Sequence, residues 1–186
     1  KTSDIQAFDP DVVVLATGSL PAIPTLEGKN SKIVLTYADV LNGIPPTFKN
    51  AVVIGAGATG LELALYLAEY GCRVRVVEML AKTAGDLESI TKKMLLGKLK
   101  EQNVDIMTET KLVRVENNGA VVTRSDGAEL LVEAEKVIFA TGTRPNNHLY
   151  EKVKSLGYEP YQVGDCRKAR TAKAAIYESA VLGRSL

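Results

Sequence analysis

The feature that most constrains the fold of this sequence is a glycine pattern, Gly-x-Gly-x-x-Gly, between an apolar run and a helix-forming stretch. The run Ala51–Ile54 has the length and composition of a buried strand, and Leu61–Tyr70 is rich in leucine, alanine and glutamate. The β-branched segment Arg73–Glu78 predicts another strand. A strand, a glycine loop, a helix and a strand within about 30 residues are typical of a doubly wound α/β sheet.

Each glycine of the pattern has a mechanical role in such a unit. Gly55 allows the tight turn, Gly57 lets the backbone approach a diphosphate, and Gly60 permits close packing of the helix on the strand. The helix would begin near Ala58, and its free N–H groups and positive dipole end attract anions. We therefore expect a dinucleotide diphosphate at this loop. The predicted binding residues are Gly55, Ala56, Gly57, Ala58, Thr59 and Gly60.

An acidic residue ends the second strand. Glu78 lies 23 positions after Gly55, close to the spacing of about 20 residues expected for a ribose-binding acid. Its carboxylate would accept hydrogen bonds from a ribose 2′-OH and repel a 2′-phosphate, which favours NAD over NADP. Two alternatives stay open. The glycines could only shape a turn, and Arg73, Arg75 or Lys82 could hold a 2′-phosphate.

The segments on either side of this unit predict further strands and helices. Upstream, Asp11–Ala16 resembles a strand buried on both faces, Ile33–Leu35 a short strand and Tyr37–Leu41 a short helix. Downstream, apolar residues at helical spacing predict a helix over Asp86–Gln102, with Asp86 as its N-cap.

Turn-forming residues at 117–119 and 125–127 then separate three strand-like segments, which predicts an antiparallel meander. The predicted strands of the meander are Lys111–Glu116, Ala120–Arg124 and Glu129–Glu133. A strand over Lys136–Ala140 and an amphipathic helix over Thr171–Leu186 follow. The expected fold class is α/β, a Rossmann-like three-layer dinucleotide-binding domain with an antiparallel β-meander.

Composition excludes several classes of protein. Hydrophobic residues make up 46% of the 186 residues, and 23 basic residues balance 22 acidic ones, which is ordinary for a globular chain and argues against a nucleic-acid partner. No apolar run reaches the length of about 20 residues that a membrane span needs, and no signal peptide is evident, so we expect a cytoplasmic protein. Cys72 and Cys166 lack the spacing of a metal site or redox pair. The first residue is Lys1 and not Met, which suggests a fragment of a longer polypeptide.

Four short motifs resemble those of flavoproteins in which an NAD(P) domain is inserted into an FAD domain. They are ATG at Ala16–Gly18, GAGATG at Gly55–Gly60, ATG at Ala140–Gly142 and GDC at Gly164–Cys166. The closing segment GDCRKARTAKAAIYESAVLGRSL, with LTYADVL and ATGTRPNNHLYEKV, is similar to the NADH:flavin oxidoreductase family, which includes 2-enoate and 2,4-dienoyl-CoA reductases.

That resemblance implies an organisation and a set of FAD contacts. Residues 1–44 would end the FAD domain, 45–145 would form the NAD(H)-binding domain, and 146–186 would return to the FAD domain. Each ATG would mark a crossing, Asp165 would contact the ribityl-phosphate region, and the helix beginning at Ala175 would approach the isoalloxazine. The implied cofactor-binding residues are Thr17, Gly18, Ala140, Thr141, Gly142, Gly164, Asp165 and Ala175. Ala169 and Ser179 depart from the proline and glycine usual at these places.

The same resemblance implies a function, hydride transfer from NADH to FAD for the reduction of an enoate or related acceptor. A barrel carrying FMN and an iron–sulfur cluster would precede this part of the chain and, with further FAD-domain segments, would be its partner. Glu62 would lie near the nicotinamide, or else stabilise the first turn of its helix. We predict no catalytic residue, because the cofactors carry out hydride transfer. The alternatives are an NADH oxidase, a ferredoxin-reductase-type electron transferase and a non-catalytic NADH sensor.

Overall fold

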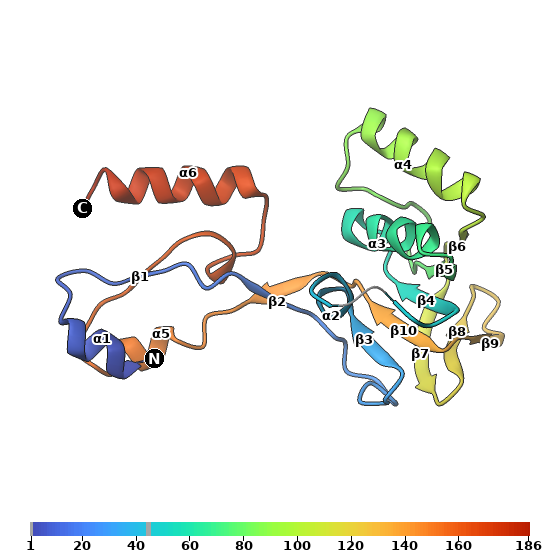
Figure 1. Ribbon diagram of the computed structural model, residues 1–186, viewed down its shortest axis with the longest axis horizontal. Coiled ribbons are helices and arrows are strands. Elements are labelled where there is room, and N and C mark those ends of the chain that lie inside the picture. The colour runs from blue at the N-terminus through green and yellow to red at the C-terminus, as the bar shows by residue number, and fades with distance from the viewer. Residues whose placement is uncertain (1, 44–45) are drawn as a thin grey trace. The chain divides into compact units, whose positions relative to one another are not determined.

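The computed structural model describes residues 2–43 and 46–186, and its contacts divide the chain into two compact units (Figure 1). The central unit is Pro21–Gly142, and the terminal unit combines Lys1–Leu20 with Thr143–Leu186. Lys1 and the expected domain boundary at residues 44 and 45 lie outside the described residues. The assignment of 1–44, 45–145 and 146–186 to cofactor domains stays a prediction.

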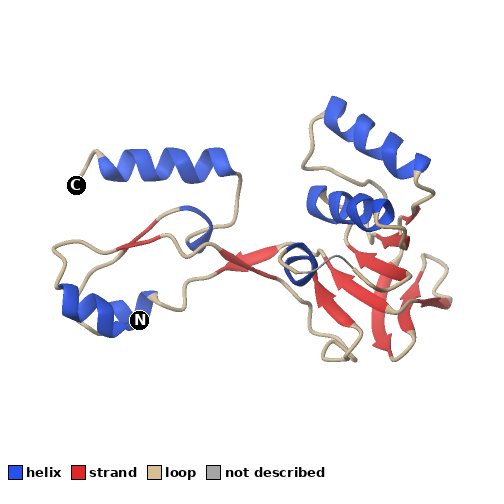
Figure 2. Ribbon diagram, in the orientation of Figure 1, coloured by secondary structure: helices blue, strands red, loops and turns tan. Residues whose placement is uncertain are grey.

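A five-stranded parallel sheet forms the middle of the central unit (Figure 2). Its strands, in spatial order, are β3 (Val34–Thr36), β10 (Lys136–Phe139), β4 (Asn50–Ile54), β5 (Arg73–Val77) and β6 (Asp105–Met107). In the register, Val53 of β4 lies between Ile138 and Val76. The expected Rossmann-like α/β fold is confirmed.

Helices cover one face of this sheet. They are α2 (Tyr37–Leu41), α3 (Ala58–Glu69) and α4 (Ser89–Glu101). Leu61 and Leu67 of α3 and Leu99 of α4 are fully buried in one cluster with Val53 and Val76 of the strands. Successive strand residues point to opposite faces, so this cluster takes alternate residues of β4 and β5.

The antiparallel meander covers the other face. It consists of β7 (Lys111–Glu116), β8 (Gly119–Thr123) and β9 (Glu129–Glu133). Val52 and Phe139 of the parallel sheet pack there with Val122 and Val132 of the meander. The central strands β4 and β10 are therefore buried on both faces, as their continuous apolar runs predict, and the unit has three layers.

The terminal unit is built from short elements. These are α1 (Thr2–Phe8), β1 (Val14–Leu15), β11 (Thr143–Pro145), α5 (Tyr150–Lys154), β12 (Tyr161–Gln162), the 3₁₀ turn η1 (Gly164–Cys166) and α6 (Ala172–Gly183), together with β2 (Ser19–Pro21), whose last residue is the first of the central unit. Strand β1 pairs in parallel with β12, and β2 pairs with β11. The buried cluster contains Leu15, Val153 and Cys166.

Two sequence-based expectations are wrong in detail. The segment Asp11–Ala16 contributes only the two-residue strand β1, and Val12 and Val14 are each 43% exposed. The physical reason is that β1 and β12 form a two-stranded sheet, which buries far less than the central sheet. Helix α4 begins at Ser89 after an N-cap at Glu88, so Asp86 is not its cap.

Candidate functional site

The glycine loop joins the carboxyl end of β4 to the start of α3, and two of its glycines are required by close backbone contacts. Gly55 has a φ of +105°, and a Cβ there would lie 2.6 Å from the carbonyl oxygen of Ala140. A Cβ on Gly60 would lie 2.0 Å from the carbonyl oxygen of Gly55. A side chain at Gly55 would therefore push the loop away from the end of β10, and a side chain at Gly60 would push α3 away from the loop.

Gly57 differs from these two glycines, because the space beside it is nearly free of protein atoms. It is the N-cap of α3 with a φ of −72°, which any residue adopts. A Cβ there would meet only the two carboxylate oxygens of Asp86, at 3.6 and 3.8 Å. No backbone atom therefore blocks the approach of a ligand to Gly57, and the protein atoms nearest to its Cβ position are the carboxylate oxygens of Asp86.

Glu78 lies against the glycine loop, directly after β5. Its Oε2 accepts a hydrogen bond from the backbone N–H of Ala56 at 2.8 Å, and its Oε1 accepts one from Leu80 at 2.9 Å. A carboxylate has about four acceptor positions, so further donors such as ribose hydroxyls can still bind it. The structure brings the predicted ribose-binding acid to the predicted diphosphate loop.

A second carboxylate, which the sequence did not predict at this place, lies at the N-terminus of α3. Both side-chain oxygens of Asp86 are 3.1 Å from the backbone nitrogen of Ala58 and accept its hydrogen bond. Asp86 is exposed to solvent, as is the neighbouring Thr59. The signal that could have found this contact is an acid in the loop after the second strand, facing a helix start that attracts anions.

Glu62 is exposed and is the fifth residue of α3. It therefore lies beyond the first turn, and the structure does not support a role in stabilising that turn. Its expected position near a nicotinamide stays a prediction.

The second ATG motif forms hydrogen bonds between the last residues of the central unit and its first residues. The N–H of Ala140 donates to the carbonyl of Ile54 at 2.9 Å. Thr141 donates its hydroxyl to the carbonyl of Ala22 at 2.6 Å, and the carbonyl of Gly142 accepts from the N–H of Ala22 at 3.0 Å. These bonds give Thr141 and Gly142 a structural role.

The first ATG motif makes similar bonds within the terminal unit. The hydroxyl of Thr17 donates to the backbone carbonyl of Asn146. The side-chain amide nitrogen of Asn146 donates in turn to the backbone carbonyl of Thr17 at 3.0 Å. The backbone N–H of Asn146 donates to the carbonyl of Gly18 at 2.9 Å. The side-chain oxygen of Asn146 is buried and has no hydrogen-bond partner among the described residues. A donor from a bound group would satisfy it.

The GDC motif forms the turn η1, which α6 approaches closely. Gly164 has a φ of +68°, and a Cβ there would lie 3.2 Å from the Cβ of Ala175. The carboxylate of Asp165 accepts hydrogen bonds from the N–H of Arg170 at 3.1 Å and from the hydroxyl of Ser19 at 3.3 Å. Asp165 is thus fixed on one side by the chain's own donors.

Glu178 of α6 is the centre of a small charged cluster. Its Oε2 accepts from the N–H of Gly164 at 3.1 Å, and its Oε1 pairs with the guanidinium of Arg170. Arg167 lies 3.5 Å from the same oxygen. The bonds from Arg170 and Gly164 hold the pKa of Glu178 below its ordinary value. This cluster was not predicted from the sequence.

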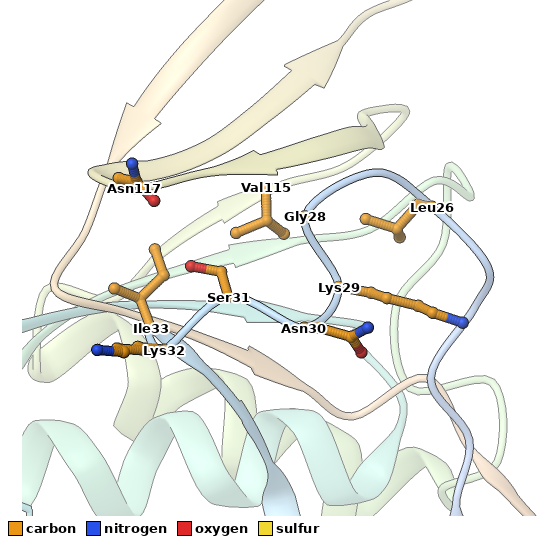
Figure 3. A pocket seen from close by; sticks show the side chains of 9 residues that line it. All are labelled: Leu26, Gly28, Lys29, Asn30, Ser31, Lys32, Ile33, Val115 and Asn117. Carbon is orange, nitrogen blue, oxygen red and sulfur yellow. The ribbon is translucent and has the colours of Figure 1, made fainter.

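A shallow hollow of about 630 Å³ lies elsewhere in the central unit (Figure 3). It is lined by Leu26, Gly28, Lys29, Asn30, Ser31, Lys32, Ile33, Val115 and Asn117. It adjoins the amino end of β3, whereas the glycine loop follows the carboxyl end of the parallel strand β4. Lys29 and Lys32 extend to opposite sides in Figure 3, so they do not converge on one anion.

Among residues 2–43 and 46–186, no group of three or more histidine, cysteine or acidic side chains is placed to hold a metal ion. No described helix is both long and apolar enough to cross a membrane. Cys72 and Cys166 are both free and buried.

Comparison with known proteins identifies the family. Residues 1–163 match the pyridine nucleotide-disulphide oxidoreductase family. The chain belongs to this family.

The relatives of this chain include an oxidase and reductases. It is 34% identical to the NADH oxidase of Thermoanaerobacter brockii over 166 residues, which are 87% of this chain and 26% of the relative. It is 32% identical to the bilirubin reductase of Mediterraneibacter gnavus over 164 residues, 88% of this chain and 25% of that protein. A 2-naphthoyl-CoA reductase in complex with 2-naphthoyl-CoA has a TM-score of 0.89 at 28% identity, covering 95% of this chain and 27% of its own. This chain spans about a quarter of each relative's length.

The contrast between Gly57 and Gly60 yields a stability prediction. Gly60→Ala places a methyl group against the Gly55 carbonyl and should lower the free energy of unfolding by about 1–3 kcal/mol, despite the better helix propensity of alanine. The methyl group of Gly57→Ala would meet no backbone atom, so this substitution should change the free energy of unfolding by less than about 1 kcal/mol. Urea unfolding followed by circular dichroism measures both. Equal losses would contradict the assignment of different roles to these glycines.

The two thiols should be nearly unreactive in the folded chain. Burial and the nearby charge of Glu135 raise the pKa of Cys72 to about 11, so little thiolate exists at neutral pH. Cys166 is fully buried, and its sulfur contacts the carbonyl of Leu15 at 3.0 Å. Reaction with DTNB at pH 7.5 should be more than about 100-fold slower in the folded protein than in urea. A rapidly reacting thiol in the folded chain would contradict this expectation.

The charged cluster around Glu178 predicts a pH-dependent stability. The folded-state pKa of Glu178 lies below its ordinary value of 4.5, so the ionised carboxylate stabilises the fold above that pH. This stabilisation is lost as the pH falls through the lowered value. Glu178→Gln should therefore be less stable than the wild type at pH 7, and the difference should shrink below pH 4.5. Denaturant unfolding across this range tests it, with Glu151→Gln, an exposed residue of α5, as the control.

Proposed function

We propose that this chain is the nicotinamide-dinucleotide-binding part of an NADH-dependent flavin oxidoreductase. The observation that carries the proposal is the arrangement at the start of α3. There an open glycine backbone and a helix N-terminus lie beside Glu78, which is 2.8 Å from the N–H of Ala56. A diphosphate and a ribose need these two features side by side.

The residues at this place fit a dinucleotide. The N–H of Ala58 already donates to an anionic group in this structure, since both carboxylate oxygens of Asp86 lie 3.1 Å from its nitrogen. The backbone of Ala58 and Thr59 would hold the diphosphate, and Glu78 would orient the ribose and exclude a 2′-phosphate. Glu62, exposed on the second turn of α3, would lie toward the nicotinamide.

The terminal unit offers features that fit a flavin nucleotide. The N–H of Gly164 already binds a carboxylate, which shows that η1 can hold an anion, and the buried oxygen of Asn146 lacks a donor among the described residues. Asp165 would bind ribityl hydroxyls with its remaining acceptor positions. The chemistry that the two cofactors would supply when bound is hydride transfer from NADH to FAD. The chain's own residues would bind and orient them.

For the complete protein, we propose reduction of an enoate or a related acceptor. The similarity of the closing segment to 2-enoate and 2,4-dienoyl-CoA reductases supports this, together with the relatives that are named as reductases. On this proposal, a barrel with FMN and an iron–sulfur cluster would be the partner that contacts the acceptor. The 34% identity to an NADH oxidase favours one alternative, in which the complete protein is an NADH oxidase.

Titration with NADH and NADPH, followed by nicotinamide fluorescence, tests the proposal. The wild-type chain should prefer NADH, and Glu78→Gln should weaken NADH binding by about 10-fold or more and reduce the preference, because one charge-assisted hydrogen bond and the repulsion of a 2′-phosphate are lost. Glu69→Gln makes the same chemical change at the far end of α3 and should behave as the wild type. If the wild type binds neither nucleotide, the proposed function fails. If it prefers NADPH, Glu78 does not select the ribose.

A further inference from the structure

The contact between Asp86 and the start of α3 has a consequence for ligand binding. The first N–H groups of a helix have no partner within the helix, and a phosphate bound there uses those groups. In this structure both oxygens of Asp86 lie 3.1 Å from the nitrogen of Ala58 and beside the open backbone of Gly57. A diphosphate at Gly57 and Ala58 would occupy the place of this carboxylate. The negative charges of the diphosphate and of the Asp86 carboxylate would also repel each other.

The loop that carries Asp86 is fastened to the glycine loop by a separate contact. The N–H of Ala84 donates to the carbonyl of Ala56 at 2.7 Å, and Ala84 is 2% exposed. Its φ of +48° lies in the left-handed region, which is unfavourable for alanine. At the α4 side, Lys92 donates to the carbonyl of Thr83. The buried Ala84 therefore fixes the loop, while Asp86, two residues on, is exposed and has room to turn away.

Asp86 does not cap the helix that follows it. That helix, α4, begins at Ser89, and its N-cap Glu88 makes no side-chain hydrogen bond to it. An aspartate side chain accepts well from the free N–H groups at a helix start. Here the carboxylate instead caps α3, whose N-cap is Gly57 and has no side chain to offer. The arrangement supplies α3 with an anion in the free chain.

We propose that Asp86 is an internal competitor of the dinucleotide. Its carboxylate occupies the N-terminus of α3 in the free chain, and the diphosphate displaces it on binding. This inference rests on the proposed function, because it concerns the same site. Asp86 would thus lower the affinity for the nucleotide, and the fastened loop would return it to α3 when the nucleotide leaves.

The affinity of Asp86→Asn tests the proposal, with ADP and NADH as probes measured by calorimetry and nicotinamide fluorescence. Asparagine keeps an oxygen that can cap α3 but removes the charge. The dissociation constants for ADP and NADH should fall by about 3- to 10-fold, the size expected for one charge at a helix N-terminus. Adenosine has no phosphate, so its affinity should not change. Glu88→Gln, two residues along the same exposed loop, should leave all three affinities as in the wild type.

A second measurement follows the contact without any ligand. The amide resonance of Ala58 should shift in Asp86→Ala relative to the wild type, and saturating ADP should move the wild-type resonance away from its free position. If ADP and NADH bind, but Asp86→Asn binds them equally or more weakly, the inference is wrong and the proposed function stands. If neither protein binds a nucleotide, the proposed function fails and the inference fails with it. An unshifted Ala58 amide in Asp86→Ala would also overturn the inference.

Discussion

The close approach of Gly60 to the carbonyl of Gly55 is the contact on which the central unit depends. It lets α3 start directly at the carboxyl end of β4, and Gly55 in turn passes the carbonyl of Ala140 at the end of β10. Because three backbone segments meet without a side chain between them, α3 packs closely against the sheet. Leu61 and Leu67 then become fully buried against β4 and β5. A single Cβ at Gly60 would separate these layers.

The same contact creates the conditions for binding. The first N–H groups of α3 lie at the carboxyl ends of the parallel strands, where β4 and β5 end side by side. Glu78 and Asp86 belong to the segment that follows β5. The carboxylate of each accepts hydrogen bonds from backbone N–H groups. Backbone donors at a helix start attract anions, so the chain fills the place with its own carboxylates. A carboxylate of the chain also accepts a backbone hydrogen bond at the turn η1, where the N–H of Gly164 donates to Glu178.

Much of the central unit follows from local sequence. The helix over Tyr37–Leu41 is found at the predicted residues, and the three meander strands lie within one residue of their predicted bounds. Periodicity and turn residues determine such elements, since both act over a few positions. The terminal unit was harder to predict, because the apolar run before Thr17 looks like a buried strand but pairs with only one short strand. An apolar run does not specify how many neighbours it will have.

Residue type and spacing along the chain are enough to predict a glycine loop between a strand and a helix, with an acid at the end of the next strand. Which carboxylate binds which backbone donor depends instead on the folded chain. Asp86 caps the helix that begins 28 residues before it, and not the helix that follows it, because the folded loop brings it to α3. A local pattern specifies that an aspartate can cap a helix, but the choice of helix depends on long-range packing.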